Sequence, residues 1–168
     1  MNKKYEFVEG DEVTTPSGVT LKRIRALIAI ADAAFMPAVN PGDLGGYIQS
    51  ENNLSEICNA WVYGNAQVSG NARVSGNARV YGNARVADDG LIFWASKVGT
   101  ENGTLTVYNG KDDTLLVTRG CFLGSPTEFL EESKRVHDAR THHEYKLLIK
   151  VATSRIEAAR ARSLEAKK

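Results

Sequence analysis

A six-residue unit repeats without interruption in the middle of the chain and restricts its fold more than any other feature. Each copy reads Ala-x-Val-x-Gly-Asn, and the last copy stops after its Val. Ala stands at positions 60, 66, 72, 78 and 84, and Val stands two residues after each of them. A fixed short period of this kind predicts a stacked repeat architecture.

The unit itself is best interpreted as a very short strand followed by a corner. Ala and Val lie two residues apart, so on an extended strand their side chains share one face. Gly-Asn turns the chain, because both residues tolerate a positive φ. Strands of ordinary hairpins usually run about 5–6 residues without their turns, so a six-residue unit is too short for a meander. We therefore expect a coil that closes every three units around a small core of Ala and Val.

Three units per coil give a stacking period of eighteen residues. This period places Trp61 over Arg79 and Tyr63 over Tyr81 on one outer face of the coil. The clean repeats supply only about one and a half coils, and stacked repeats need capping elements at their ends. We therefore expect the flanking segments to cover the coil.

The run Val-Ser-Gly-Asn-Ala-Arg resembles the hexapeptide repeat of the left-handed parallel β-helix, which has an aliphatic residue first and a small residue fifth. The left hand is implied by this resemblance alone, since crossover connections in general are right-handed. The resemblance also implies trimers, the habitual state of proteins with such repeats. Residues 42–48, 59–66 and 120–125 look like segments of small repeat proteins encoded by phages and prophages. That second resemblance implies no particular activity and no catalytic residue.

The whole chain predicts a mainly β protein with a helical C-terminus. Extended runs flank the repeat, and Thr15–Gly18 and Asn109–Gly110 are turn signals between them. Upstream of the repeat, Ile48 and Leu54 extend the apolar pattern, whereas Glu56 stands where an inward aliphatic residue is expected. The predicted parts are a β-rich segment over 1–46, the hexapeptide β-helix over 47–88, a cap of β-strands over 89–122 and two helices over 123–168.

The two helices are predicted from a start signal and an apolar stripe. Ser125, Pro126 and Glu128 supply a capping Ser, a Pro in the first turn and a Glu at the capping-box position. The first helix should run to about residue 138, and the second from residue 142 or 144 to about 164. On the second helix, the apolar residues at 147, 148, 151, 156 and 159 suit one buried stripe.

Composition narrows the class of protein. The 168 residues carry a net charge of +1, so no strong field favours nucleic acid or a membrane. No apolar run reaches the length of a membrane span, and the first residues lack the apolar core of a secretory signal. Cys58 and Cys121 form neither a disulfide framework nor a metal-ligand spacing. We expect reduced, partly buried thiols in the cytoplasm of a bacterial host, with no metal and no cofactor.

These features favour a non-enzymatic, homo-oligomeric interaction protein. Trp61, Tyr63, Arg79 and Tyr81 share one outer face, and Trp, Tyr and Arg are enriched in the hot spots of interfaces. An equally plausible alternative is that the chain's own flanking segments cover this face. We expect a trimer formed through the β-helix faces and the C-terminal helices. If the protein is viral, its partner is expected to be a host protein, such as a defence component.

Two other functions compete with this interpretation. Acyltransferase is the commonest activity on the hexapeptide β-helix, but such enzymes need a His general base near the coil. The histidines at 137, 142 and 143 all lie in the C-terminal helical part, where solvated helix ends explain them. Nucleic-acid binding would use the arginines at 73, 79 and 85, but six-residue spacing sends them out of three different faces. No Ser–His–Asp or Cys–His constellation is predicted.

Overall fold

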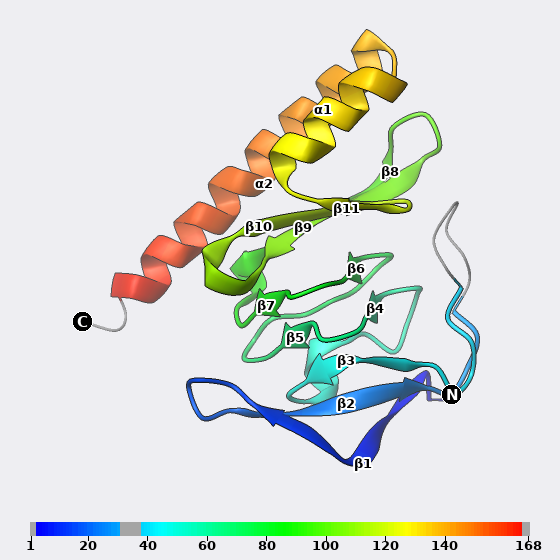
Figure 1. The fold of residues 1–168 in the computed structure, drawn as a ribbon, viewed down its shortest axis with the longest axis vertical. Coiled ribbons are helices and arrows are strands. Elements are labelled where there is room, and N and C mark those ends of the chain that lie inside the picture. Colours follow the sequence, from blue (N-terminus) through cyan, green and yellow to red (C-terminus); the bar gives the residue numbers. More distant parts are fainter. Residues whose placement is uncertain (1–2, 31–37, 166–168) are drawn as a thin grey trace.

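The computed structural model describes residues 3–30 and 38–165, and it is mainly β with two helices at the C-terminal end (Figure 1). This confirms the predicted fold class in its coarse form. The strands are β1 (Tyr5–Thr14), β2 (Thr20–Ala26), β3 (Leu44–Ile48), β4 (Trp61–Val62), β5 (Gln67–Val68), β6 (Arg79–Val80), β7 (Arg85–Val86), β8 (Ile92–Val98), β9 (Gly103–Asn109), β10 (Leu115–Arg119) and β11 (Phe122–Gly124). The helices are α1 (Pro126–Val136) and α2 (Ala139–Glu165).

The repeat forms parallel rungs that stack one coil on the next. β4 pairs with β6, with Trp61 opposite Arg79, and β5 pairs with β7, with Gln67 opposite Arg85. Both pairings join residues eighteen positions apart, as three six-residue units per coil predict. The rungs belong to separate sheets, one of order β1-β2-β3-β5-β7 and one of order β4-β6.

The interior of the coils is the predicted small apolar core. Every Ala and Val of the repeat is at most 1% exposed. These side chains alternate with outward ones because the short strands have a period of two residues. The positive φ of the corner glycines, such as 55° at Gly64, turns the chain after each strand.

The coil upstream of the repeat is two residues longer. Tyr47 of β3 pairs in parallel with Gln67, and Leu54 forms a bridge with Val74, so both partners are twenty residues apart. Leu54 is fully buried and therefore takes the inward position that Glu56 cannot fill. Glu56 is exposed and accepts a hydrogen bond from another segment of the chain, which explains the break in the pattern.

The first coil is closed by the N-terminal hairpin. β1 and β2 pair antiparallel across the predicted Thr15–Gly18 turn, and β2 pairs antiparallel with β3. This pairing covers the strand edge that the first rung would otherwise expose. Two glycines of β3 permit the close packing: a Cβ at Gly46 would lie 2.6 Å from the carbonyl oxygen of Ala66.

The last coil is closed by the antiparallel sheet of order β11-β10-β9-β8. Its side chains satisfy the backbone groups of the final rungs. Thr118 donates to the carbonyl oxygen of Arg79 (2.9 Å), and the Tyr108 hydroxyl accepts from the amide of Tyr81 (3.1 Å). The Asn109 side chain donates to the carbonyl oxygen of Arg85 (3.1 Å). Polar side chains of this sheet thus take the place of the backbone groups that a further coil would supply.

Asn109 was predicted to be a residue of a tight turn, and this prediction is wrong. It ends β9, pairs with Leu115 and is 5% exposed, so the connection to β10 is a longer loop that contains a short 3₁₀ turn. Its side chain contacts both the last coil and α2, because Arg160 donates two hydrogen bonds to its Oδ1 (2.8 and 2.6 Å). A buried amide that is bonded to both the last coil and α2 explains why this position does not form a hairpin turn.

The helices lie together against the outer side of the cap sheet (Figure 1). The predicted capping box is formed: the amide of Glu128 donates to Ser125 Oγ (3.3 Å), and the amide of Ser125 donates to Glu128 Oε2 (2.7 Å). α1 ends at Val136 and α2 begins at Ala139, slightly earlier than predicted. The last residues of the predicted tail, 166–168, lie outside the described residues.

The buried face of α2 differs from the predicted stripe. Leu147 and Val151 are 52% and 49% exposed, although the sequence assigned both to the core. The stripe that packs on the sheet consists of residues spaced alternately four and three apart, namely Tyr145, Ile149, Ala152, Ile156 and Ala159. This helix has two apolar faces, and the face that carries Tyr145 and Ile149 is the one that packs on the sheet.

Candidate functional site

Two of the four residues of the predicted interaction face, Trp61 and Arg79, are buried inside the molecule. Trp61 is fully buried, and its ring lies edge-on against that of Tyr5 on β1 (centroids 6.4 Å apart). Arg79 is 3% exposed. The N-terminal strand therefore covers Trp61, because a coil this short gains its stability from contact with the flanking segments. The prediction of a free interface at Trp61 and Arg79 is wrong.

The predicted stacking of these residues is nevertheless present. The rings of Tyr63 and Tyr81, eighteen residues apart, are parallel within 7° and 3.9 Å apart. The Arg79 guanidinium lies 5.7 Å from the centre of the Tyr63 ring, as in a cation–π contact, and donates to the Tyr63 hydroxyl. Burial raises the pKa of Tyr81. These contacts tie adjacent coils together.

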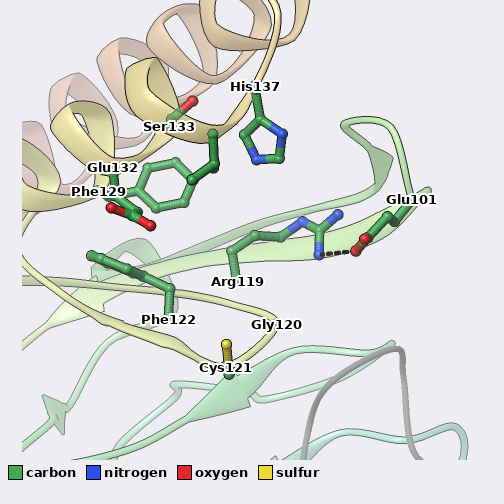
Figure 2. Close-up of a pocket in the computed structure, with 10 residues that line it drawn as sticks. Glu101, Arg119, Gly120, Cys121, Phe122, Phe129, Glu132, Ser133 and His137 are labelled. Atoms are coloured by element: carbon green, nitrogen blue, oxygen red, sulfur yellow. Dashed lines mark ion pairs between the residues drawn. The ribbon is translucent and has the colours of Figure 1, made fainter.

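A separate pocket opens where the cap sheet meets the helices (Figure 2). Its volume is about 180 Å³. The lining comes from the β8–β9 connection, the end of β10, the β10–β11 turn, β11, α1 and the residue that follows α1. The lining residues are Glu101, Arg119, Gly120, Cys121, Phe122, Phe129, Glu132, Ser133, Val136 and His137.

The β10–β11 turn is built from Gly120 and Cys121 alone, since Arg119 pairs directly with Phe122. Gly120 has a φ of 57°, and glycine at the first position of a two-residue hairpin turn suits the type II′ geometry. The turn leaves the Cys121 thiol exposed at the pocket. The expectation of partly buried thiols is wrong for both cysteines, because Cys58 also stands on an exposed corner with a φ of 64°.

Arg119 forms the polar floor of the pocket. Its side chain is 8% exposed, and its Nε donates to the Tyr145 hydroxyl of α2 (3.0 Å). Its Nη2 donates to the carbonyl oxygen of Val98 (3.3 Å), and its Nη1 lies 3.9 Å from Glu101 Oε2. The guanidinium fits because Gly103 has no side chain: a Cβ there would lie 2.5 Å from Arg119 Cζ.

Aromatic rings form the apolar wall. Phe122 and Phe129 meet edge-on with centroids 5.2 Å apart, and Phe129 meets Tyr145 in the same way at 5.1 Å. His137 follows the last residue of α1, and its ring lies 5.5 Å from that of Tyr145. This chain of rings connects both helices to the cap sheet and gives the pocket one apolar and one charged side.

Cys121 and His137 line this one pocket, although the sequence indicated no Cys–His constellation. Figure 2 shows them on opposite sides of Arg119, with Cys121 on the turn and His137 at the end of the helix. No hydrogen bond joins the two side chains, both of which the structure describes. The arrangement therefore lacks the thiol–imidazole contact that activates a nucleophile.

The pocket was missed because its parts are separated in sequence. Two signals pointed toward it: the capping box at Ser125, which sets the start of α1, and the Gly120-Cys121 pair between alternating residues, which indicates a tight turn. Neither signal reveals that the end of α1 packs over the turn. That contact depends on the register of α2 on the sheet.

The arginines at 73, 79 and 85 do not form a continuous basic surface. Arg79 is buried, and Arg85 donates to the carbonyl oxygens of Asn65 (3.2 Å) and Ala84 (2.8 Å). Arg73 is exposed on another face. Guanidinium groups that are buried or bound to the backbone cannot form a phosphate-binding strip.

Within residues 3–30 and 38–165, no group of three or more His, Cys, Asp or Glu side chains is arranged to hold a metal ion. In the same ranges, no helix combines the length and the apolar character needed to cross a membrane.

Comparison with known families agrees with the stacked coils. A family model described as "YdcK Beta solenoid repeat" matches residues 66–80 and 78–92. The chain contains a β-solenoid repeat. The two matches begin twelve residues apart, which is two six-residue units, and they cover the later rungs and the entry into β8. No curated protein matches the sequence.

Proposed function

We propose that the protein is a non-enzymatic binding protein that accepts an apolar side chain of a partner protein in the pocket above Arg119. The size of the pocket carries this proposal. Its volume of about 180 Å³ accommodates one large side chain. Sites for small molecules and cofactors usually span about 300–1,000 Å³, which favours an anchoring residue over a coenzyme or acyl donor.

The surroundings of the pocket support a protein partner. Val136 lines it and remains 49% exposed. Glu101 and Glu132 add charge at its border. Exposed apolar residues around a pocket, within a polar rim, are the arrangement in which protein interfaces place their anchor residues.

We further infer that the solenoid is a left-handed hexapeptide coil and that the protein is of phage or prophage origin. The six-residue period and the eighteen-residue pairing support the first inference. The resemblance of residues 42–48, 59–66 and 120–125 to phage-encoded proteins supports the second. A host protein in the bacterial cytoplasm, such as a defence component, is then the proposed partner.

Peptide selection on the immobilised protein tests this function. Selected peptides should share one large apolar residue and should bind Val136→Glu about tenfold or more weakly, because the new carboxylate blocks an apolar contact. Thr127→Glu adds the same charge to an exposed position of α1 outside the pocket and should bind normally. Leu123→Glu places the same charge on an exposed residue of β11 that does not line the pocket, so it should also bind normally, and circular dichroism confirms that each variant folds.

A second readout uses the thiol in the pocket. In a Cys58→Ser chain, a photo-crosslinker attached to Cys121 should join a selected peptide at its shared apolar residue. The proposal fails if no peptide is enriched, or if the peptides bind Val136→Glu as tightly as the unmodified protein.

A further inference from the structure

One side of α2 is apolar and exposed along much of its length. Leu147 and Val151 are 52% and 49% exposed, and Ser154, Ala158 and Ala161 continue the same side, all exposed. The five positions are spaced alternately four and three residues apart. This is the seam spacing of a coiled coil, and it lies opposite the stripe that packs on the sheet.

The charges beside this seam have no partners on their own helix. Lys150 and Glu157 flank it on the same side, seven residues apart, which is too far for contact along one helix. Neither forms an ion pair among the described residues. Arg160 follows Glu157 by one turn, but Asn109 Oδ1 accepts two hydrogen bonds from its guanidinium. Two opposite charges are therefore available to a second helix.

We propose that α2 pairs with α2 of a second copy of this chain, in antiparallel orientation, about a two-fold axis between Ala152 and Thr153. In this register Leu147 lies opposite Ala158 of the second copy, and Val151 lies opposite Ser154. Each large side chain thus meets a small one, which lets the helices approach closely. The axis generates every contact twice, so the assembly closes as a dimer.

Charge complementarity supports a second copy and the antiparallel orientation. In the register above, Lys150 of each chain lies beside Glu157 of the other, and charges at such flanking positions set partner and orientation. A parallel pair would instead bring Lys150 beside Arg155 of the second copy. It would also place Leu147 opposite Leu147 of the second copy and Ala158 opposite Ala158 of the second copy. The two small alanine side chains would then leave a gap between the helices.

The surface is free in the folded chain and independent of the pocket. Figure 1 shows α2 along the outside of the molecule, with its C-terminal half extending past α1. None of the seam residues lines the pocket. The dimer can therefore be tested independently of the proposed peptide binding. It replaces the trimer that the hexapeptide resemblance implied.

Charge reversal tests the pairing. Light scattering should give a mass near twice 18.3 kDa. Lys150→Glu and Glu157→Lys should each weaken the dimer about tenfold, since each change places like charges together at two symmetric sites. The double variant Lys150→Glu/Glu157→Lys should restore the affinity. Lys134→Glu, the same change at an exposed position of α1 away from the seam, serves as the matched control.

Cysteine pairs test the orientation. In a Cys58→Ser/Cys121→Ser chain, a mixture of Leu147→Cys and Ala158→Cys proteins should form a mixed disulfide in preference to a disulfide between two Leu147→Cys chains. The opposite preference means parallel pairing and overturns the proposal. A monomer at the highest soluble concentration, a trimer, or a dimer unaffected by either charge reversal overturns it as well.

Discussion

At the scale of single residues, Lys4 is a buried amine beneath the first coil. It is 1% exposed, and its Nζ donates to the carbonyl oxygen of Ala60 (2.9 Å). Its amide donates to Glu56 Oε2 (2.7 Å), which gives that outward carboxylate a structural role. Burial lowers the pKa of Lys4 to about 8, because the charged amine is poorly solvated.

The lowered pKa of Lys4 makes stability depend on pH. In the unfolded chain its pKa is about 10.4, so between about pH 8 and pH 10 the unfolded state binds more protons. The free energy of unfolding should therefore rise with pH in this window. Relative to Lys4→Met, the natural chain should gain about 2 kcal/mol between about pH 8 and pH 10. Urea unfolding of both proteins across this range measures the difference.

The comparison with Lys4→Met separates this effect from other titrating groups. Tyr5 has a pKa raised by burial and acts in the opposite direction only above about pH 10, where the unfolded chain loses its proton first. Parallel stability curves for the two proteins would contradict a buried, titrating Lys4.

At the scale of elements, the rungs are too short to hold a coil by strand pairing alone. Each of β4 to β7 contains only two residues, so the corners must supply further bonds. Asn53 does so from a fully buried position. Its Nδ2 donates to the carbonyl oxygens of Gly70 (3.1 Å) and Ala72 (2.8 Å), and its Oδ1 accepts from the amide of Ser50 (2.9 Å).

Removing this corner amide should destabilise the solenoid. Asn53→Ala leaves two carbonyl oxygens and one amide without their partner and should lower the free energy of unfolding by about 2–3 kcal/mol. Asn65→Ala changes an exposed corner asparagine and should stay within about 0.5 kcal/mol of the natural chain. Chemical unfolding monitored by circular dichroism measures both. Equal effects at the two positions would argue against the bridging role of Asn53.

At the scale of the whole molecule, one hydrophobic core runs from the N-terminal hairpin to α2. Its buried residues extend from Tyr5, through every Ala and Val of the repeat, to Ala159. Both ends of the solenoid are covered, by antiparallel strands on one side and by the cap sheet with its helices on the other. The parts therefore lack separate cores.

A shared core predicts a single unfolding transition. In a Trp94→Phe chain, Trp61 fluorescence reports on the solenoid while far-ultraviolet circular dichroism reports on the helices. Both signals should share one midpoint. Ile156→Ala, a cavity in the buried face of α2, should lower that midpoint for both signals by an equivalent of about 2–4 kcal/mol. Two transitions, or a shift of the helical signal alone, would show that the solenoid folds independently.

The repeat and its register could be predicted from sequence because they depend on neighbours along the chain. Alternation places Val68 and Val80 inside, Gly-Asn makes the corners, and the stacking of Tyr63 on Tyr81 follows from the period. The start of α1 was predictable for the same reason, since a capping box is a contact between Ser125 and Glu128, three residues apart.

Contacts between distant segments were decided by the tertiary structure alone. The faces of α2 that carry Leu147 and Ile149 have similar spacing, and only the shape of the cap sheet determines which one is buried. The sequence pattern predicts that Trp61 is an exposed interface residue, whereas in the folded chain the N-terminal strand packs over it. The pocket joins residues near 101, 120 and 137, whose proximity no local pattern encodes. The sequence by itself determined what repeats and where it turns, because those are local properties. Only the folded chain decided what is covered and what remains free, because burial depends on every segment at once.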